Sequence, residues 1–288
     1  MILRTARWES ENGFTARFHP NTPFLLHGIT DTLGAEAQIV KAPGQDGATT
    51  YAVSLGQPVI NLVGSLRASG ATFDEKRKHF DRLQDELSRA FLPNRFGLLI
   101  DERPGGYRQI RCRPIAKPSF GARIGNMCSV DIEFLADMPH WTTVDETLLT
   151  LGMEVGGFRF PLRLPTRMGT YTKTGILKNG TGENIWPVIE IFSASEYVSV
   201  KNLTTGKKTE INRPIAAHQK MVIDTYNTRA VVWQMDEQGD WAEVEDVSNW
   251  LTLDSEYWPL VPGRNEVQVS NEVMGQDVVT VIRYRTPV

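Results

Sequence analysis

The strongest hydrophobic pattern in the chain lies in residues 72–92 and has the period of an α-helix. Its apolar positions are Phe73, Phe80, Leu83, Leu87 and Phe91. This spacing lines one side of a repeat of about 3.6 residues per turn. Thr72 is a favourable N-cap, Glu75 completes a capping box with it, and Pro93 ends the helix. The pattern predicts one long helix over about residues 73–92, which covers a sheet with its apolar side.

The remaining first half of the chain alternates between apolar and polar residues with a period of two. In residues 127–134 the apolar residues Cys128, Val130, Ile132 and Phe134 share one face, and polar residues occupy the positions between them. Residues 1–18 resemble a hairpin that turns at Asn12-Gly13. Residues 1–145 are therefore predicted to form an antiparallel β-sandwich or barrel-like domain around the helix.

The second half has many short strand patterns, separated by turn signals such as Asn179-Gly180 and Pro262-Gly263. Frequent turns between short strands are typical of a β-sandwich or jelly roll. The chain is therefore predicted to be mainly β, with a second domain over residues 146–288. Residues 146–168 are expected to be linker-like, because Gly156-Gly157, Pro161 and Pro165 interrupt the alternation. The strand patterns cover residues 186–192, 197–203, 208–211, 220–224, 229–234, 266–269 and 278–284.

The composition describes an ordinary globular chain of 288 residues, with 41% hydrophobic and 23% charged residues. A formal net charge of −3 gives no overall attraction to nucleic acid or to an anionic membrane. Cys112 and Cys128 cannot form a disulfide scaffold, and we expect them to be free thiols, although a single bridge between them stays open. No segment has the pattern of a secretion signal or a membrane span. We expect a soluble protein that is made in a cytoplasm.

The search for catalytic chemistry finds no established enzyme motif in the sequence. Nucleophile-elbow, zinc-protease, phosphate-loop, dinucleotide and calcium-loop patterns are missing, and the five histidines have no ligand spacing. The sequence therefore predicts no catalytic residues, no metal and no cofactor. A glycan-cleaving enzyme stays open as an alternative, because its two carboxylates can lie far apart in the sequence.

A basic run extends from Arg103 to Arg123, with six basic residues and no acidic one. Its central members Arg108, Arg111, Arg113 and Lys117 are candidates for a surface that faces passing DNA or an acidic patch on a partner protein. The alternative is that these are strand residues on a solvated face, some of them paired with carboxylates elsewhere in the chain.

The second half is also rich in aromatic residues, and Trp233, Trp241 and Trp258 are its candidates for stacking on a sugar ring. A β-sandwich with exposed tryptophans is typical of carbohydrate-binding modules. The alternative is packing, because one tryptophan covers a large area in the core or at the rim of a small sandwich. Both interpretations stay open at this point.

Several segments together carry a resemblance to a known family. In the first half these are Pro43-Gly44-Gln45-Asp46-Gly47, the long helix after a strand, Gly97-Leu98-Leu99, Gly106-Tyr107, Arg111-Cys112-Arg113-Pro114 and residues 134–141. In the second half they are residues 179–182, 186–189, 202–206, 223–225 and 260–265. In this order and spacing, the chain resembles the distal tail proteins (Dit) of long, non-contractile-tailed bacteriophages along essentially its whole length.

The resemblance implies structural work at the tail tip of the virion, after synthesis in the cytoplasm of the bacterial host. Proteins of this family form a ring, usually a hexamer, around a channel that DNA crosses during ejection. The N-terminal domain builds the ring, and a galectin-like C-terminal sandwich projects outward. The implied partners are the tail tube protein, the hub or fibre protein, the tape-measure protein and receptor-binding proteins, and no membrane is involved. The leading alternative is a carbohydrate-binding protein that acts through the C-terminal sandwich.

The loop at Pro43, Gly44, Asp46 and Gly47 is the candidate subunit interface. It is glycine-rich, lies between strands and has no evident core of its own to cover. We therefore expect this loop and its flanks to embrace the adjacent subunit. The basic strand would face either the channel or the tube protein. A protein partner is favoured, because a lumen that bound phosphates strongly would slow the passage of DNA.

Overall fold

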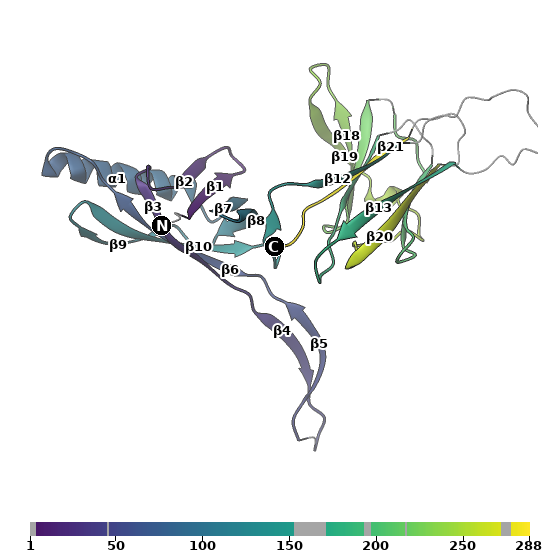
Figure 1. Cartoon of the computed structure of the whole chain (residues 1–288), viewed down its shortest axis with the longest axis horizontal. Coiled ribbons are helices and arrows are strands. Elements are labelled where there is room, and N and C mark those ends of the chain that lie inside the picture. The colour runs from purple at the N-terminus through teal and green to yellow at the C-terminus, as the bar shows by residue number, and fades with distance from the viewer. Residues whose placement is uncertain (1–3, 45, 153–170, 193–196, 217, 272–277) are drawn as a thin grey trace, which may run out of the picture. The chain divides into compact units, whose positions relative to one another are not determined.

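A computed structural model describes residues 4–44, 46–152, 171–192, 197–216, 218–271 and 278–288 (Figure 1). The chain divides into two compact units. The first comprises Met1–Val144 together with Val288, and the second comprises Asp145–Pro287. Both units are built mostly from antiparallel strands, which confirms the predicted mainly-β class. Each unit has its own hydrophobic core.

The first unit consists of a nine-stranded antiparallel sheet, a separate two-stranded ribbon and one long helix. The sheet has the order β2-β1-β7-β8-β10-β6-β3, with β11 beside β8 and β9 beside β10. The elements are β1 (Thr5–Ser10), β2 (Thr15–Phe18), β3 (Phe24–Thr32), β4 (Ala35–Val40), β5 (Thr49–Leu55), β6 (Val59–Arg67), α1 (Phe73–Ala90), β7 (Gly97–Arg103), β8 (Gly106–Pro114), β9 (Ser119–Ile124), β10 (Met127–Ala136) and β11 (Thr142–Thr143).

The large sheet curls so that its two edge strands, β2 and β3, come close together. They are joined by only a short turn, and the His19 amide donates to the Phe24 carbonyl at 2.9 Å. The ring of Phe18 on β2 reaches across to β6, where a Cβ added at Gly64 would lie 3.4 Å from it. The same Cβ would lie 2.5 Å from the Leu25 carbonyl oxygen, so this close approach requires glycine. The curl gives the barrel-like character that the sequence predicted.

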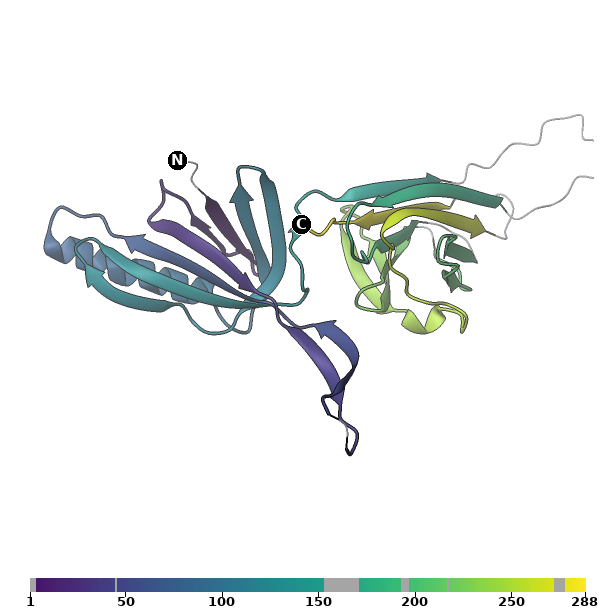
Figure 2. The same cartoon turned by 60° about the horizontal axis from the view of Figure 1, so that its bottom comes forward.

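Helix α1 covers one face of the curled sheet (Figures 1 and 2). Phe80, Leu83, Leu87 and Ala90 are buried on its sheet side. The following residue, Phe91, packs against Trp8 with ring centroids 5.6 Å apart and against Phe134 at 5.8 Å. The predicted apolar stripe is therefore correct from its second member onward. Phe73 is an exception, because the first helical residue lies beyond the sheet and is exposed.

The start of α1 forms the capping box that the sequence predicted. The Thr72 hydroxyl accepts a hydrogen bond from the Glu75 amide at 3.3 Å, and the Glu75 carboxylate accepts from the amides of Ala71 and Thr72. Replacing Thr72 by alanine is expected to lower the free energy of unfolding by about 1 kcal/mol, because an orphan amide loses its acceptor. Urea unfolding of the two proteins measures this difference. Serine at the same position keeps the hydroxyl and should restore most of the loss.

The second unit is the predicted β-sandwich of two antiparallel sheets. Six strands pair in the order β12-β21-β14-β17-β18-β19, and four strands in the order β13-β20-β15-β16. Its elements are β12 (Thr147–Gly152), β13 (Tyr171–Asn179), β14 (Val188–Phe192), β15 (Val198–Asn202), β16 (Lys208–Ile211), β17 (Gln219–Asp224), β18 (Arg229–Met235), β19 (Trp241–Asp246), the 3-10 helix η1 (Ser248–Trp250), β20 (Gly263–Asn271) and β21 (Val279–Tyr284).

The expectation that residues 146–168 are linker-like is wrong for their first part. Residues 147–152 form strand β12, which pairs in register with β21 from Thr147 opposite Tyr284 to Gly152 opposite Val279. Leu151 is buried and Leu149 packs against the same core, so alternate residues of this strand belong to the sandwich. The short Thr-Leu-Leu-Thr-Leu pattern did not indicate this partner, which lies more than 120 residues later. Residues 153–168 lie outside the described residues.

Three asparagines that the sequence places in turns stabilise the loops of the sandwich through hydrogen bonds from buried side chains. Asn179, Asn202 and Asn265 are all buried. The Asn179 side-chain amide donates to the Leu260 carbonyl at 2.9 Å, and that of Asn265 donates to the Val261 carbonyl at 2.7 Å. Asn202 donates to the side-chain oxygen of Asn265 at 3.2 Å. These amides satisfy loop backbone groups that the core would otherwise leave unpaired.

Candidate functional site

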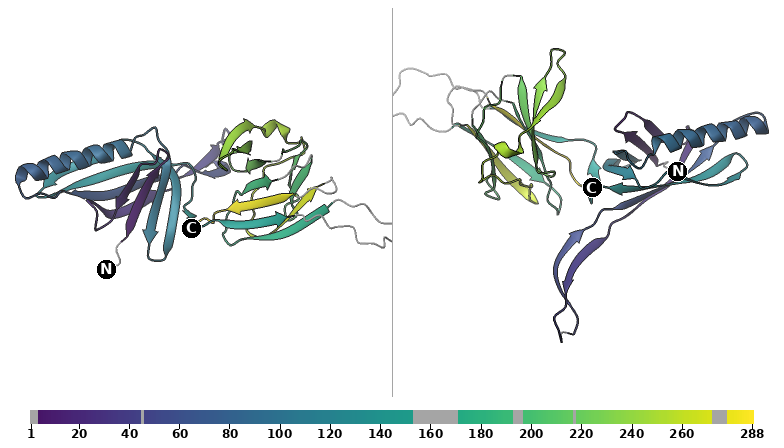
Figure 3. Two further views of the ribbon diagram at one scale, coloured as in Figure 1. Left: turned by 90° about the horizontal axis from the view of Figure 1, so that it is seen from above. Right: turned by 180° about the vertical axis from the view of Figure 1, so that it is seen from behind.

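The most distinctive feature of the first unit is the arm, which we define as strands β4 and β5 with the turn between them. The arm leaves the curled sheet after β3 and returns to it before β6, and it projects as a ribbon on its own (Figures 1 and 3). The strands pair from Ala35 opposite Leu55 to Val40 opposite Thr49, with one bulge. Every residue of both strands is exposed. An isolated two-stranded ribbon is only marginally stable in water.

The two faces of the arm differ in chemistry. Side chains alternate along a strand, so Ala35 and Ala37 of β4 share a face with their partners Leu55 and Val53 of β5. Ile39 continues this face opposite Thr50, and Tyr51 lies in the bulge beside them. Apart from Thr50 these residues are apolar or aromatic, and none is covered by the chain. The exposed fractions are 60% for Ile39, 71% for Tyr51, 64% for Val53 and 48% for Leu55. A contiguous exposed apolar surface of this kind marks an interaction site.

The predicted interface loop forms the tip of the arm. Pro43, Gly44, Asp46 and Gly47 are exposed, and Gln45 lies outside the described residues. Gly44 and Gly47 have φ angles of 81° and 89°, a region that favours glycine. The glycines therefore build the turn that reverses the chain. The sequence located the tip but missed the larger apolar face behind it, although the alternating patterns in residues 35–39 and 51–55 carry that signal.

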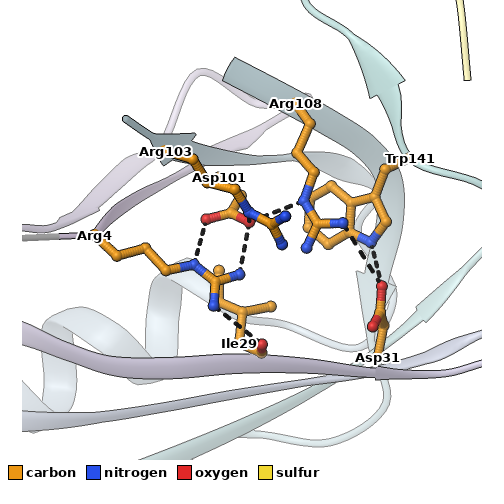
Figure 4. A network of polar contacts seen from close by, with 7 residues as sticks. All are labelled: Arg4, Ile29, Asp31, Asp101, Arg103, Arg108 and Trp141. Atoms are coloured by element: carbon orange, nitrogen blue, oxygen red, sulfur yellow. Dashed lines mark hydrogen bonds and ion pairs between the residues drawn. The ribbon is translucent and has the colours of Figure 1, made fainter. Parts of the chain in front are cut away.

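A charged cluster ties together the strands of the curled sheet near the root of the arm (Figure 4). Its centre is Asp101 of β7, which is fully buried. Arg4 donates to both carboxylate oxygens of Asp101, at 2.7 and 2.6 Å. Arg103 donates at 2.7 Å and Arg108 at 2.9 Å. Burial alone would raise the pKa of Asp101, but hydrogen bonds from three guanidinium groups outweigh it and hold the pKa below its ordinary value.

The cluster continues to the root of the arm through Arg108 and Trp141. The Arg108 guanidinium carbon lies 4.0 Å from the centre of the Trp141 ring, a cation–π contact. The Trp141 indole N–H donates to Oδ2 of Asp31 at 2.8 Å, and Arg108 lies 3.8 Å from the same oxygen (Figure 4). Asp31 is near the end of β3, a few residues before the arm begins. The arm therefore leaves the sheet from a point that is fixed by three side chains.

A cavity of about 210 Å³ opens at this root. Its lining combines apolar groups from the two chain segments that enter and leave the arm with polar groups of the cluster. The lining residues are Asp31, Leu33, Pro58, Arg108, Pro139, His140, Trp141 and Val288. All of them belong to the first unit.

The basic strand is for the most part internally neutralised. Arg108 pairs with Asp101, and Arg111 pairs with Glu11 at 2.7 Å and Asp137 at 2.8 Å. Arg103 and Arg123 also have carboxylate partners. Within the described part of the chain, Arg113 and Lys117 have no carboxylate within ion-pair distance, and both are exposed. The arginines of β7 and β8 that pair with carboxylates thus lie together in the sheet, whereas Arg113 and Lys117 are exposed on the surface.

The three tryptophans proposed for sugar stacking lie in different environments. Trp258 is fully buried in the second core, so it cannot present a ring face to a sugar, and its role is packing. Trp241 is partly exposed and packs edge-on against Phe192 at 6.0 Å, with Lys220 4.8 Å above its ring. Trp233 is also partly exposed. An exposed aromatic pair that the candidate set omitted is Trp186 with Tyr226, at 6.4 Å.

Two other classes of feature, metal sites and membrane-spanning helices, have no candidate among the described residues. No group of three or more histidine, cysteine, aspartate or glutamate side chains there could hold a metal ion. No described helix has the length and apolar character to cross a membrane. Cys112 and Cys128 are both buried and free, and burial raises the pKa of both thiols.

Comparison with known proteins finds a family match for the second unit and a fold match for the whole chain. Residues 179–286 match a family model described as siphovirus-type tail component, C-terminal domain, of the SPP1 Dit type. The whole fold matches the crystal structure of Dit (gp 19.1) from phage SPP1, with a TM-score of 0.62 and 13% sequence identity. That match covers 97% of this chain and 98% of the SPP1 protein. Residues 179–286 therefore match the siphovirus-type tail component family, and the chain as a whole has the fold of a siphophage distal tail protein.

Further solved structures place the same fold in larger assemblies. A chain of the phage P2 baseplate in its activated conformation with Ca has a TM-score of 0.54 and 11% identity, and the match covers 100% of this chain and 99% of that one. A second structure of that baseplate, with Sr, has a TM-score of 0.52 and 11% identity and covers 97% of this chain and 98% of that one. No curated protein sequence matches the chain. The family model describes a phage tail component, and the last two structures are of a phage baseplate.

Proposed function

We propose that this distal tail protein closes into a ring of about six copies, held by the arm of each subunit on its neighbour. The observation that carries the proposal is the uncovered apolar face of the arm, from Ile39 on β4 to Val53 and Leu55 on β5. An arm that projects from one side of a subunit meets a different surface on the next one. Such a contact is head-to-tail, and it forms a ring when the rotation between subunits closes.

The ring surrounds a channel that DNA crosses without being held. The charges of the basic strand support this part of the proposal, because ion pairs within the chain occupy Arg103, Arg108, Arg111 and Arg123. DNA affinity depends on the number of phosphates that free lysines and arginines neutralise. The exposed pair of Arg113 and Lys117 adds little to this number in each subunit. These two side chains instead contact an acidic patch on a tail protein.

The ring joins the tail tube on one side to the hub or fibre protein on the other, and the second unit carries the contacts to receptor-binding proteins. In this role the protein is a scaffold and has no catalytic step. The buried position of Trp258 removes one of the three side chains on which the sugar-binding alternative depended. The described structure therefore favours an adaptor over a lectin.

The test of the proposal is the mass of the purified full-length chain in solution. We expect light scattering at micromolar and tens of micromolar concentrations to give a mass that rises to about six subunits, with open-centred rings in negative-stain images of the same sample. A monomer at every concentration, with no rings in the images, would overturn the proposal that the chain closes the ring through its own arms.

A further inference from the structure

We propose that the cavity at the root of the arm is the receptor for the arm of the neighbouring copy, and that Tyr51 is the side chain that enters it. This inference rests on the proposed ring and adds the residues that meet. The arm needs a surface that covers its apolar face, and the root offers a hollow with exposed apolar side chains, Leu33 and Val59, close to its opening. Each copy thus carries one arm, which binds a neighbour, and one cavity, which binds the arm of another neighbour.

The size of the cavity fits one aromatic side chain. Its volume of about 210 Å³ is somewhat larger than the roughly 150 Å³ of an engineered cavity that binds benzene. Tyr51 is the one aromatic residue on the apolar face and the most exposed of the large apolar side chains there. Insertion of its ring also brings Val53 and Leu55, which follow it on the same strand, towards the rim.

The chemistry of the lining fits tyrosine better than an aliphatic side chain. Leu33, Pro58 and Pro139 provide apolar surface for the ring. Asp31 provides an acceptor for the hydroxyl, because its side chain is 45% exposed and only its Oδ2 is bonded to the Trp141 indole. Among the described residues, no donor is bonded to Oδ1 of Asp31. A tyrosine hydroxyl that donates to this oxygen forms a charge-assisted hydrogen bond.

An arm that enters the cavity must come from another copy, because the arm cannot reach its own root. Tyr51 and Leu55 belong to the same extended strand, β5, and Pro58 follows it. At about 3.3 Å per residue, Tyr51 lies on the order of 13 Å beyond Leu55 and farther still from Pro58. Donor and receptor are therefore different surfaces of one chain, as a head-to-tail ring contact requires.

Photo-crosslinking tests the contact directly. Tyr51 is replaced by benzoyl-phenylalanine in full-length chain, and rings are assembled from a mixture of ¹⁴N- and ¹⁵N-labelled protein. After irradiation we expect mass spectrometry to find crosslinks between light and heavy chains that join position 51 to the lining residues Leu33, Pro58, Pro139 or Trp141. The same crosslinker at Ala52, on the opposite face of β5, is the matched control and should not label the cavity.

A mutant cycle tests the hydrogen bond. Tyr51→Phe removes the hydroxyl, and Asp31→Asn keeps an acceptor for Trp141 but removes the charge. Each change should raise the subunit dissociation constant about tenfold, and the double variant should be little worse than either single one. Additive effects, or crosslinks to another part of the neighbouring copy, would overturn this inference while leaving the ring intact. Absence of rings in the wild-type sample would instead reject the proposed function.

Discussion

Replacing Asp101 by asparagine is expected to lower the free energy of unfolding of the first unit by about 3–5 kcal/mol. The carboxylate is fully buried and accepts hydrogen bonds from Arg4, Arg103 and Arg108. Asparagine has nearly the same shape, but it turns an NH₂ group towards guanidinium N–H groups and leaves three cations around a neutral side chain. Removing one partner of a buried charge cluster is costly, because the remaining charges stay desolvated.

The contribution of Asp101 to the free energy of unfolding should also depend on pH. Because the pKa of Asp101 is lower in the folded protein than in the unfolded chain, the ionised group stabilises the fold at every pH above its unfolded pKa, about 3.9. The contribution is lost as pH falls from there through the lower folded pKa. The stability difference between wild type and Asp101→Asn should therefore be constant near neutral pH and narrow below about pH 4.

Urea unfolding between pH 3 and pH 7, followed by amide hydrogen exchange in β7 and β10, measures both effects in the first unit. Asp131→Asn is the matched control, because Asp131 lies on β10 with its side chain exposed to solvent. We expect this control to change the free energy of unfolding by no more than about 0.5 kcal/mol. A loss for Asp101→Asn as small as that of the control would show that the arginines stabilise the sheet through their other contacts.

Changing Ile39 and Val53 together to serine is expected to abolish ring assembly while the subunit stays folded. Both side chains are exposed on the apolar face of the arm, 60% for Ile39 and 64% for Val53, so the isolated subunit loses little core packing. If the neighbour buries them, each contributes about 1.5–3 kcal/mol to the contact. The loss should weaken each subunit contact by at least about a hundredfold.

Light scattering and negative-stain images, at concentrations where the wild type is assembled, measure this effect. The control is the double variant Gln38→Ser with Ala52→Ser. These two residues are partners across the ribbon and lie on its other face, so the control introduces the same residue type there. We expect the control to assemble as the wild type does. Equal assembly of both double variants would show that the apolar face is not the contact, and equal loss would point to a general effect on the ribbon.

Local signals in the sequence were sufficient for much of the fold. The capping residues Thr72 and Glu75 and the spacing of Phe80, Leu83 and Leu87 specify α1 and its buried side, because each depends only on neighbours within two turns. The alternation in β10 specifies which face is wet. The resemblance indicated a distal tail protein, which the family match and the fold then confirmed.

Other features depend on partners that are far away in the chain, and only the tertiary structure decided them. The basic run was a candidate binding surface in the sequence, but Arg108 and Arg111 are neutralised by Asp101, Glu11 and Asp137 once the sheet has formed. Strand β12 is recognisable only through its pairing with β21.

The residues of the arm show the same division. Alternation along residues 35–39 and 51–55 carries the signal of an apolar face on the arm, although the prediction from sequence covered only the loop at its tip. The sequence could not determine that this face stays uncovered, because exposure depends on where the rest of the chain goes. The cavity likewise combines Asp31, Arg108 and Trp141, which come together only when β3, β8 and the segment after β10 meet. Local order is encoded by neighbouring residues, whereas a surface and its hollows are set by long-range packing.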